Sequence, residues 1–256
     1  MLGVTMGDAN GVGPEILVRA YAEHAIQDEF LVYGDRAVLE YAAERLGLSA
    51  SLAREIPLME QGLLERPDIT PGELSKRVGA AAAEYVVAAT HDALAKKLDA
   101  IVTLPMNKEA TRASRPDFSG HTELIAEVCG NPPVTMMLAS DQLIVTHVST
   151  HVALRRAIEL ATTERILEVI RLTHEAVRRL RPQARIAVAG INPHAGEHGA
   201  FGTEDDAQIR PAVEQARSEG MDVLGPEPGD TVFFNTFGGV GSTPSSACTT
   251  TRATSP

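Results

Sequence analysis

Short apolar runs alternate with longer helical patterns along most of this chain. The runs typical of buried strands are residues 2–6, 30–33, 100–104, 134–138, 143–147 and 185–189. The helical patterns fall at residues 36–46, 71–97, 162–180 and 204–218. Such alternation predicts an α/β fold, in which helices cover the faces of a mainly parallel sheet. The runs 134–138 and 143–147 are separated only by Ala139–Gln142, which predicts an antiparallel pair.

The composition limits the class of protein and its partners. The chain has 256 residues, 44% of them hydrophobic, which is enough for one large or two modest domains. Its net charge of −11 argues against a nucleic-acid or acidic-membrane partner, because neutralising phosphates requires clustered Lys and Arg. No apolar run is long enough to span a membrane, and the N-terminus shows no export signal. With only two cysteines, Cys129 and Cys248, a cytoplasmic protein in a reducing compartment is predicted.

Two histidine segments follow predicted strands. Ile191–Glu197 reads Ile-Asn-Pro-His-Ala-Gly-Glu, which predicts a turn at the rim of a sheet, where open α/β folds bind ligands. Val145–His151 is the second segment. His151 and His194 are therefore candidate metal ligands, although a single histidine at a strand end is more often structural. His147 faces the same side as His151 on an extended chain; it is either an outer partner of a metal site or, as we favour, packing.

Seven motifs occur in the order found in a known family. They are Gly7-Asp-x-x-Gly-x-Gly-Pro-Glu15, Thr103-x-Pro-x-x-Lys108, Gly120-His-Thr-Glu123, Ser149-Thr-His151, Asn192-Pro-His-Ala-Gly-Glu197, Gly202-Thr-Glu204 and Asp230-Thr231. Each motif is short and weak alone. Together they resemble the 4-hydroxythreonine-4-phosphate dehydrogenase family of pyridoxine biosynthesis over residues 2–237.

The resemblance implies a fold and an activity. The family is similar in architecture to isocitrate and isopropylmalate dehydrogenases, with two α/β/α lobes, a cleft between them and a homodimer. For this chain it predicts interleaved lobes within residues 1–237 and an incomplete C-terminal part. The family oxidises the secondary alcohol of a phosphorylated four-carbon acid with NAD or NADP, and decarboxylation follows. It uses a divalent metal (Zn, Mg or Co) held by three histidines, of which His151 and His194 match two.

The resemblance also assigns roles to other residues. His121 and Thr122 match the pair that contacts substrate, and Lys108 is a candidate for meeting an anionic group. Asp230 matches an aspartate that would orient a ligand or transfer a proton. Plain alternatives are a helix cap at Thr122, a solvated Lys108 and a turn-forming Asp230. Gly7–Gly13 lacks the dinucleotide-fingerprint spacing and is interpreted as a turn that lines the cleft.

The composition changes at Gly238. Residues 238–256 are rich in Ser, Thr and Gly without core periodicity, which predicts a disordered tail. The genetic code allows a second interpretation. With permitted codons, a shifted frame over Gly241–Pro256 yields Phe-Asp-Ala-Val-Val-Gly-Met-Tyr-His-Asp-Gln-Gly-His-Ile-Pro, which contains the Tyr-His-Asp-Gln-Gly motif of the family's third metal histidine. We therefore expect a chain that is frameshifted after residue 237 and truncated, which nucleotide sequencing of that region tests.

The sequence leaves several functions open. The first is oxidation of 4-phosphooxy-L-threonine in pyridoxal phosphate biosynthesis. A variant acts on 4-phospho-D-threonate or 4-phospho-D-erythronate, since Asp8-Ala-Asn-Gly11 departs from the common Pro-Ala-Gly form. A second class is a non-catalytic product, because the chain as translated lacks the third histidine. A metallohydrolase is disfavoured, because no His-Glu-x-x-His signature is present.

Overall fold

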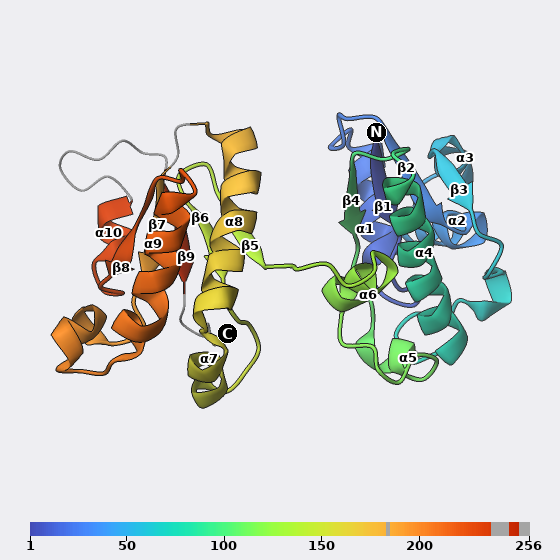
Figure 1. Ribbon diagram of the computed structural model, residues 1–256. Helices are drawn as coiled ribbons and strands as arrows, with labels where there is room; N and C mark the ends of the chain where they lie inside the picture. The colour runs from blue at the N-terminus through green and yellow to red at the C-terminus, as the bar shows by residue number, and fades with distance from the viewer. Residues whose placement is uncertain (183–184, 237–245, 251–256) are drawn as a thin grey trace. The chain divides into compact units, whose positions relative to one another are not determined.

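The computed structural model describes residues 1–182, 185–236 and 246–250. The chain divides into two compact units, Met1–Pro132 and Pro133–Pro256. Each unit has its own sheet with helices packed on it, which confirms the predicted α/β class (Figure 1). Each sheet takes all its described strands from one half of the sequence, and the interleaved lobes within residues 1–237 stay a prediction. None of the helices in the described ranges is long and apolar enough to cross a bilayer.

The sheet of the first unit has four parallel strands in the order β3-β2-β1-β4. They are β1 (Leu2–Thr5), β2 (Phe30–Gly34), β3 (Leu58–Glu60) and β4 (Ala100–Thr103). In the register of the sheet, Val4 is opposite Val32 on β2 and Val102 on β4. Because the strands are parallel, all four carboxyl ends lie at one edge, which we call the carboxyl edge of the first sheet.

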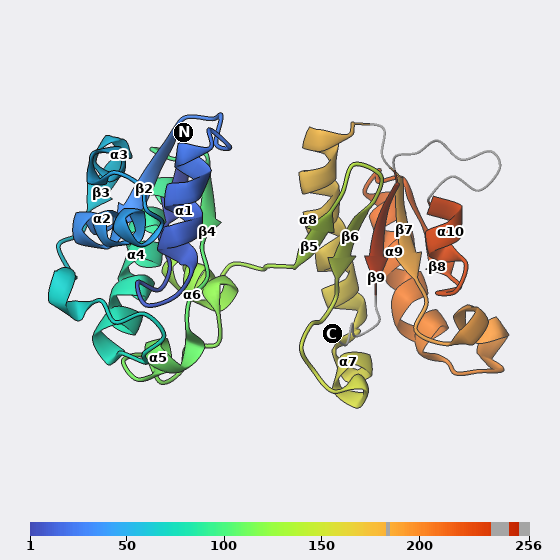
Figure 2. The same cartoon turned by 180° about the vertical axis from the view of Figure 1, so that it is seen from behind.

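Helices cover both faces of this sheet. They are α1 (Gly13–Ala22), α2 (Arg36–Arg45), α3 (Ala50–Glu55), η1 (Arg66–Asp68), α4 (Lys76–Leu94), α5 (Lys108–Arg112) and α6 (His121–Val128). α4 lies on one face, and α1 and α2 lie on the other (Figure 1, Figure 2). The core formed with the sheet includes Leu17, Leu39 and Tyr85, which are almost fully buried. This burial of apolar surface is the main stabilising contribution to the unit.

The longest helix of the first unit is shorter than its sequence pattern. The helical pattern covers residues 71–97, whereas α4 begins at Lys76. Ser75 is the N-cap, and its hydroxyl oxygen accepts a hydrogen bond from the Val78 amide over 3.4 Å. The Pro71-Gly72 pair at the start of the pattern favours a turn rather than a helix. The helix therefore begins only after the Ser75 cap.

The second unit has a five-stranded sheet in the order β5-β6-β9-β7-β8. The strands are β5 (Met137–Ala139), β6 (Ile144–His147), β7 (Arg185–Ala189), β8 (Val223–Glu227) and β9 (Ser246–Thr250). β5 and β6 form the predicted antiparallel pair, with Leu138 opposite Val145. The four strands β6, β9, β7 and β8 are parallel to one another, so their carboxyl ends share one edge, the carboxyl edge of the second sheet.

Helices also lie on both faces of the second sheet. They are α7 (Leu154–Leu160), α8 (Thr163–Leu180), η2 (Pro193–Gly199), η3 (Asp205–Ile209), α9 (Arg210–Ser218) and α10 (Val232–Thr236). Alternate residues of β7 contact helices on opposite faces of the sheet. Ile186 and Val188 belong to the core made with α8 and α9, whereas Ala187 and Ala189 pack with Val232 of α10. The two faces of β7 therefore pack against two different layers of helices.

Both predicted helices of the second unit are present, one of them altered. The pattern at 162–180 forms α8, and Thr162 is its N-cap, with the hydroxyl oxygen accepting a hydrogen bond from the Arg165 amide over 3.2 Å. The pattern at 204–218 is divided into a π turn, η3, and the α-helix α9. A π turn inserts an extra residue into the helical repeat, and such turns are frequent at functional sites.

The prediction of a disordered tail over residues 238–256 is wrong for residues 246–250. Within the segment 238–256, Ser246–Thr250 forms β9, whose backbone pairs with Ile144–His147 on one side and Arg185–Val188 on the other. Without β9, the facing N–H and C=O groups of both neighbours would have no ladder partner inside the sheet. The β-branched threonines of this stretch also favour a strand. The rest of the tail, including the change at Gly238, lies outside the described residues.

Candidate functional site

Three predicted site residues lie in loops at the carboxyl edge of the second sheet. His151 follows β6, His194 follows β7, and Asp230 follows β8. These strands are parallel, and β9 lies between β6 and β7. The three loops therefore leave the sheet on the same side. Open α/β sheets bind ligands outside the carboxyl ends of their strands.

His151 is exposed on a loop whose base is fixed. Its φ is +57°, a region that residues other than glycine adopt rarely. Arg165 of α8 holds the loop: its Nε donates to the Val148 carbonyl over 3.1 Å and its Nη2 to the Val134 carbonyl over 2.8 Å. The hydroxyl oxygen of Ser149 is buried without a hydrogen-bond partner in the described part of the chain. Helix α8 thus anchors the loop while the imidazole of His151 faces outward.

His147 is packed inside the second unit. Its side chain is only 2% exposed, and its Nδ1 lies 3.3 Å from the carbonyl oxygen of Met136. The hydroxyl of Thr135 donates to the His147 carbonyl over 2.7 Å. This environment agrees with the packing interpretation that the sequence favours.

Asp230 occupies an exposed turn between β8 and α10. The turn is closed by hydrogen bonds from the amides of Thr231 and Val232 to the Pro228 carbonyl, over 3.1 Å and 2.9 Å. This geometry is that of a turn-forming aspartate, and it also leaves the carboxylate available to a ligand at the carboxyl edge.

His194 lies on a loop with a left-handed backbone. The dihedral φ is positive at five successive residues, His194 to His198, with values of 52°, 52°, 83°, 41° and 55°. Only Gly196 among them lacks a Cβ, and runs of left-handed residues are disfavoured for L-amino acids. The His194 ring is exposed, and its centroid lies 6.0 Å from that of Phe201. We call residues 194–198 the left-handed turn.

The described residues do not complete the three-histidine metal site that the resemblance implies. His151 and His194 supply two imidazoles from loops at one edge of the sheet, and β9 lies between the strands that those loops follow. Over residues 1–182, 185–236 and 246–250, no group of three His, Cys, Asp or Glu side chains is arranged to hold a metal ion. Catalytic zinc sites use three protein ligands. The third ligand is therefore missing from this part of the chain.

The first unit brings His121 and Lys108 together. Lys108 begins α5 and His121 begins α6, and both helices follow the carboxyl end of β4. The charge of Lys108 is close enough to lower the pKa of the His121 imidazole. Gly120 is the N-cap of α6, so Thr122 is not the cap; it is exposed in the first turn, and Lys108 is exposed too. No side chain caps α6, which leaves the amides of its first turn able to bind an anion.

Burial lowers the pKa of His121 below its ordinary value. Loss of hydration is the largest cause, a hydrogen bond to the Leu104 backbone opposes it, and the charge of Lys108 adds to the lowering. Nε2 is buried and has no hydrogen-bond partner among the residues that the structure describes. The ring nitrogen that donates to the Leu104 carbonyl is therefore Nδ1, and the neutral ring keeps a lone pair on Nε2. An anion at Nε2 requires the ring to take up a proton.

We expect inorganic phosphate to raise the pKa of His121. At neutral pH the half-buried ring is neutral, so binding of an anion at Nε2 couples to proton uptake, and phosphate should bind more tightly as the pH falls below neutrality. Titrating the imidazole carbon-bound protons by NMR, with and without phosphate, measures this shift. The exposed His91 on α4 is the internal control, and its carbon-bound proton signals should not respond to phosphate at constant pH. A His121 pKa that does not respond to saturating phosphate would contradict the assignment.

The sequence analysis gives no site role to Asp8, which links two loops of the first carboxyl edge. Its amide donates to the Pro105 carbonyl over 3.0 Å, so the loops after β1 and β4 are joined. The side chain is 5% exposed, and burial raises the pKa of its carboxyl group, against hydrogen bonds from the amides of Asn10, Asn107 and Gly11. An aspartate in a glycine-rich segment is typical of a turn, so its sequence signal is weak.

Comparison with known proteins identifies the family. Residues 26–240 match the family described as pyridoxal phosphate biosynthetic protein PdxA. The chain belongs to the PdxA family. A 4-hydroxythreonine-4-phosphate dehydrogenase of Beijerinckia indica is 41% identical over 247 residues, which cover 91% of this chain and 73% of the relative. A D-threonate 4-phosphate dehydrogenase of Cupriavidus necator is 41% identical over 252 residues, which cover 91% of this chain and 75% of the relative.

Solved structures agree with the fold of this PdxA family member. A 4-hydroxythreonine-4-phosphate dehydrogenase from Burkholderia phymatum has a TM-score of 0.84 and 38% identity, covering 98% of this chain and 79% of that structure. One from Klebsiella pneumoniae has a TM-score of 0.87 and 33% identity, covering 98% of this chain and 81% of that structure. The family resemblance drawn from the seven motifs, and the α/β fold class that it implies, are thereby confirmed.

Proposed function

We propose that this PdxA family member is an NAD(P)-dependent dehydrogenase that oxidises the secondary alcohol of 4-phosphooxy-L-threonine (4-hydroxythreonine-4-phosphate), with decarboxylation following. The observation that carries the proposal is the family match over residues 26–240. A relative named for that enzyme, 41% identical over 247 residues, supports it. The proposal includes a place in pyridoxal phosphate biosynthesis and a cytoplasmic homodimer, without nucleic-acid or membrane partners.

The surroundings of His121 support recognition of a phosphorylated acid. Three features that favour an anion occur together at the carboxyl edge of the first sheet: the ammonium group of Lys108, the uncapped first turn of α6, and an imidazole whose buried Nε2 lacks a partner in the described ranges. Thr122 adds an exposed hydroxyl donor in the same turn. We assign these residues to the phosphate or carboxylate of the substrate.

The reaction needs a hydride acceptor and a proton acceptor. The alcohol carbon gives its hydride to the nicotinamide ring of NAD or NADP, the hydroxyl proton passes to a base, and a ketone β to the carboxylate results. Loss of carbon dioxide then moves the electron pair of the broken bond toward the ketone oxygen, which takes a proton. Asp230, in the loop after β8, is our candidate for the proton acceptor.

A divalent metal is part of the proposal, with His151 and His194 as its ligands. When bound, Zn, Mg or Co would lower the pKa of the substrate hydroxyl and stabilise the developing negative charge. The described residues supply only two of the three imidazoles, so the metal site is incomplete in the described part of the chain. We therefore expect weak metal binding and impaired turnover from the chain as given.

A second substrate is favoured by one local feature. Asn10 lies in the segment Asp8-Ala-Asn-Gly11, which departs from the common Pro-Ala-Gly form, and it is 7% exposed. Its Oδ1 accepts from the Thr70 amide over 2.8 Å, and its Nδ2 donates to the Glu73 carbonyl over 3.0 Å. The Cupriavidus necator relative named D-threonate 4-phosphate dehydrogenase is as similar to this chain, at 41% identity. The same chemistry on 4-phospho-D-threonate or 4-phospho-D-erythronate is therefore the alternative.

The test is NAD(P)H formation by the purified chain with each phosphorylated acid, in the presence of Zn, Mg or Co ions. We expect slow turnover of at least one phosphorylated acid and none of the same acid without its phosphate. The acid with the highest kcat/KM identifies the branch of the family. Calorimetric binding of a phosphorylated acid without any NAD(P)H formation would instead support the non-catalytic alternative.

A further inference from the structure

A buried carboxylate stands directly behind the loop that carries His194. Asp205, at the start of η3, is fully buried. Its Oδ1 accepts from the Ile191 amide over 2.8 Å, and its Oδ2 accepts from the amide of Asn192 over 3.1 Å and from the side-chain Nδ2 of Asn192 over 2.8 Å. A carboxylate is buried only when its oxygens are bonded in this way. All three donors come from the two residues at the entry to the loop.

Neighbouring groups fit closely around this contact. Asn192 Nδ2 also donates to Glu204 Oε2 over 2.8 Å, a hydrogen bond that is the main reason for the lowered pKa of Glu204. Gly190 approaches so closely that an added Cβ would lie 2.7 Å from Asp205 Oδ1. The segment Gly190–Asn192 is therefore held against Asp205 by the hydrogen bonds of Asn192 and by the close approach of Gly190. A side chain at residue 190 would push this segment away from Asp205.

Packing offers little support to the left-handed turn. His194, Glu197 and His198 are exposed, and Gly196 is its one buried residue. A left-handed run of residues with Cβ atoms persists only where its surroundings over-determine it. Since three of its five residues are exposed, the polar contacts at its base contribute to that constraint.

We propose that Asp205 is a positioning residue for His194. Its carboxylate holds the backbone of Ile191 and the backbone and side chain of Asn192, and so maintains the left-handed turn that presents the His194 imidazole at the carboxyl edge of the second sheet. This inference rests on the proposed function, in which His194 meets a ligand there. It assigns to Asp205, which contacts neither metal nor substrate, the task of orienting a proposed metal ligand.

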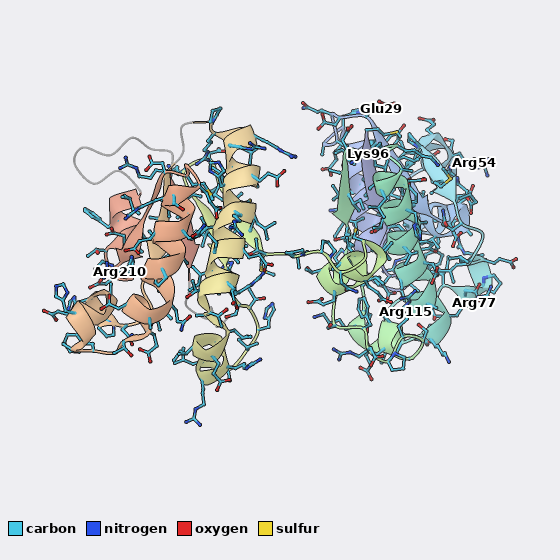
Figure 3. The ribbon with its side chains drawn as sticks, viewed as in Figure 1. Glu29, Arg54, Arg77, Lys96, Arg115 and Arg210 are labelled. Atoms are coloured by element: carbon cyan, nitrogen blue, oxygen red, sulfur yellow. The ribbon has the colours of Figure 1, made fainter. Side chains whose placement is uncertain are left out.

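The test compares Asp205→Asn with Asp206→Asn. Asn at 205 replaces one carboxylate oxygen by an N–H group, which then faces a backbone or side-chain donor. Asp206 is the adjacent residue of the same π turn, but it is exposed and pairs with Arg210, labelled in Figure 3. The two variants therefore remove the same charge from neighbouring positions, and only one of them touches the loop.

Two measurements report on the loop itself. Hydrogen exchange of the amides in residues 190–200 should become about 10-fold faster in Asp205→Asn and stay unchanged in Asp206→Asn. Zn²⁺ affinity measured by calorimetry, well below the melting temperature, should fall about 10-fold to 100-fold in Asp205→Asn alone. Asp205→Glu keeps both acceptor oxygens and should recover part of the exchange protection.

The outcomes separate this inference from the proposed function. A lower melting temperature in Asp205→Asn with normal loop exchange and zinc affinity would overturn the positioning role, because that pattern is purely structural. If Asp205→Asn does not fold, Asn192→Ala, which removes only the side-chain bonds, carries the same exchange test. If the unmodified chain neither binds Zn²⁺ nor turns over, the proposed function fails, while the exchange data still decide the role of Asp205.

Discussion

Replacing residues 241–256 with the alternative-frame sequence is expected to strengthen Zn²⁺ binding by about 100-fold or more. The histidine of its Tyr-His-Asp-Gln-Gly string falls on the codons of Thr249 and Thr250, at the carboxyl end of β9. Thr250 is in register with His147 on β6, and β9 is paired with β7 on its other side. A histidine there would join the loops of His151 and His194 at one sheet edge. A third imidazole completes the ligand number of a catalytic zinc site.

Isothermal titration calorimetry of the two chains with Zn²⁺ measures this difference. In the replaced chain, His194→Ala should remove most of the gain, because the new imidazole acts with the existing ones. His91→Ala, at an exposed position on α4 in the first unit, should leave it unchanged. Equal zinc affinity of the original and replaced chains would count against both the two-histidine assignment and the frameshift interpretation.

Asp35→Ala is expected to lower the free energy of unfolding of the first unit by about 3 to 5 kcal/mol. Asp35 is fully buried after β2 and accepts hydrogen bonds from the amides of Leu63 and Leu64, over 3.1 Å and 2.9 Å, and from the hydroxyl of Tyr85. Alanine leaves three buried donors without an acceptor, and each unsatisfied donor costs about 1 to 3 kcal/mol. The contact also ties the segment after β3 to α4.

Urea unfolding followed by tyrosine fluorescence measures this loss. The chain has no tryptophan, and its four tyrosines all lie in the first unit, so their emission reports on that unit. Asp35→Asn, which keeps one acceptor oxygen, should cost less than Asp35→Ala. The exposed Asp28→Ala should change stability by no more than about 0.5 kcal/mol. Similar losses for Asp28→Ala and Asp35→Ala would disprove the role of the buried contact.

Many elements of the fold are predictable from local pattern alone. The apolar runs became β1, β2, β4, β5, β6 and β7, and the antiparallel pair is as predicted. β3 and β8 are not, for local reasons. Leu58–Glu60 is too short to show a period, and Val223–Glu227 contains a Gly-Pro pair that is typical of a turn. β9 is not predicted either, because its strand-forming threonines lie in a Ser-Thr-rich segment without core periodicity.

The candidate site divides in the same way. His151, His194 and Asp230 are marked by motifs at strand ends, and the structure places each in a loop after a parallel strand. Asp205 carries no such mark, because its importance comes from Ile191 and Asn192, which fold back onto it. A carboxylate in an acidic segment is indistinguishable from a solvated one until its burial is known.

The amino-acid pattern by itself determined the α/β class, the family and the residue types available for chemistry, because strand and helix periods and motif spacings are local properties of a chain. Only the tertiary structure decided which loops share a sheet edge, that Ser246–Thr250 completes the second sheet, and that burial gives His121 a lowered pKa. Strand order and burial depend on contacts between residues far apart in sequence, and these determine hydrogen-bond partners and solvation.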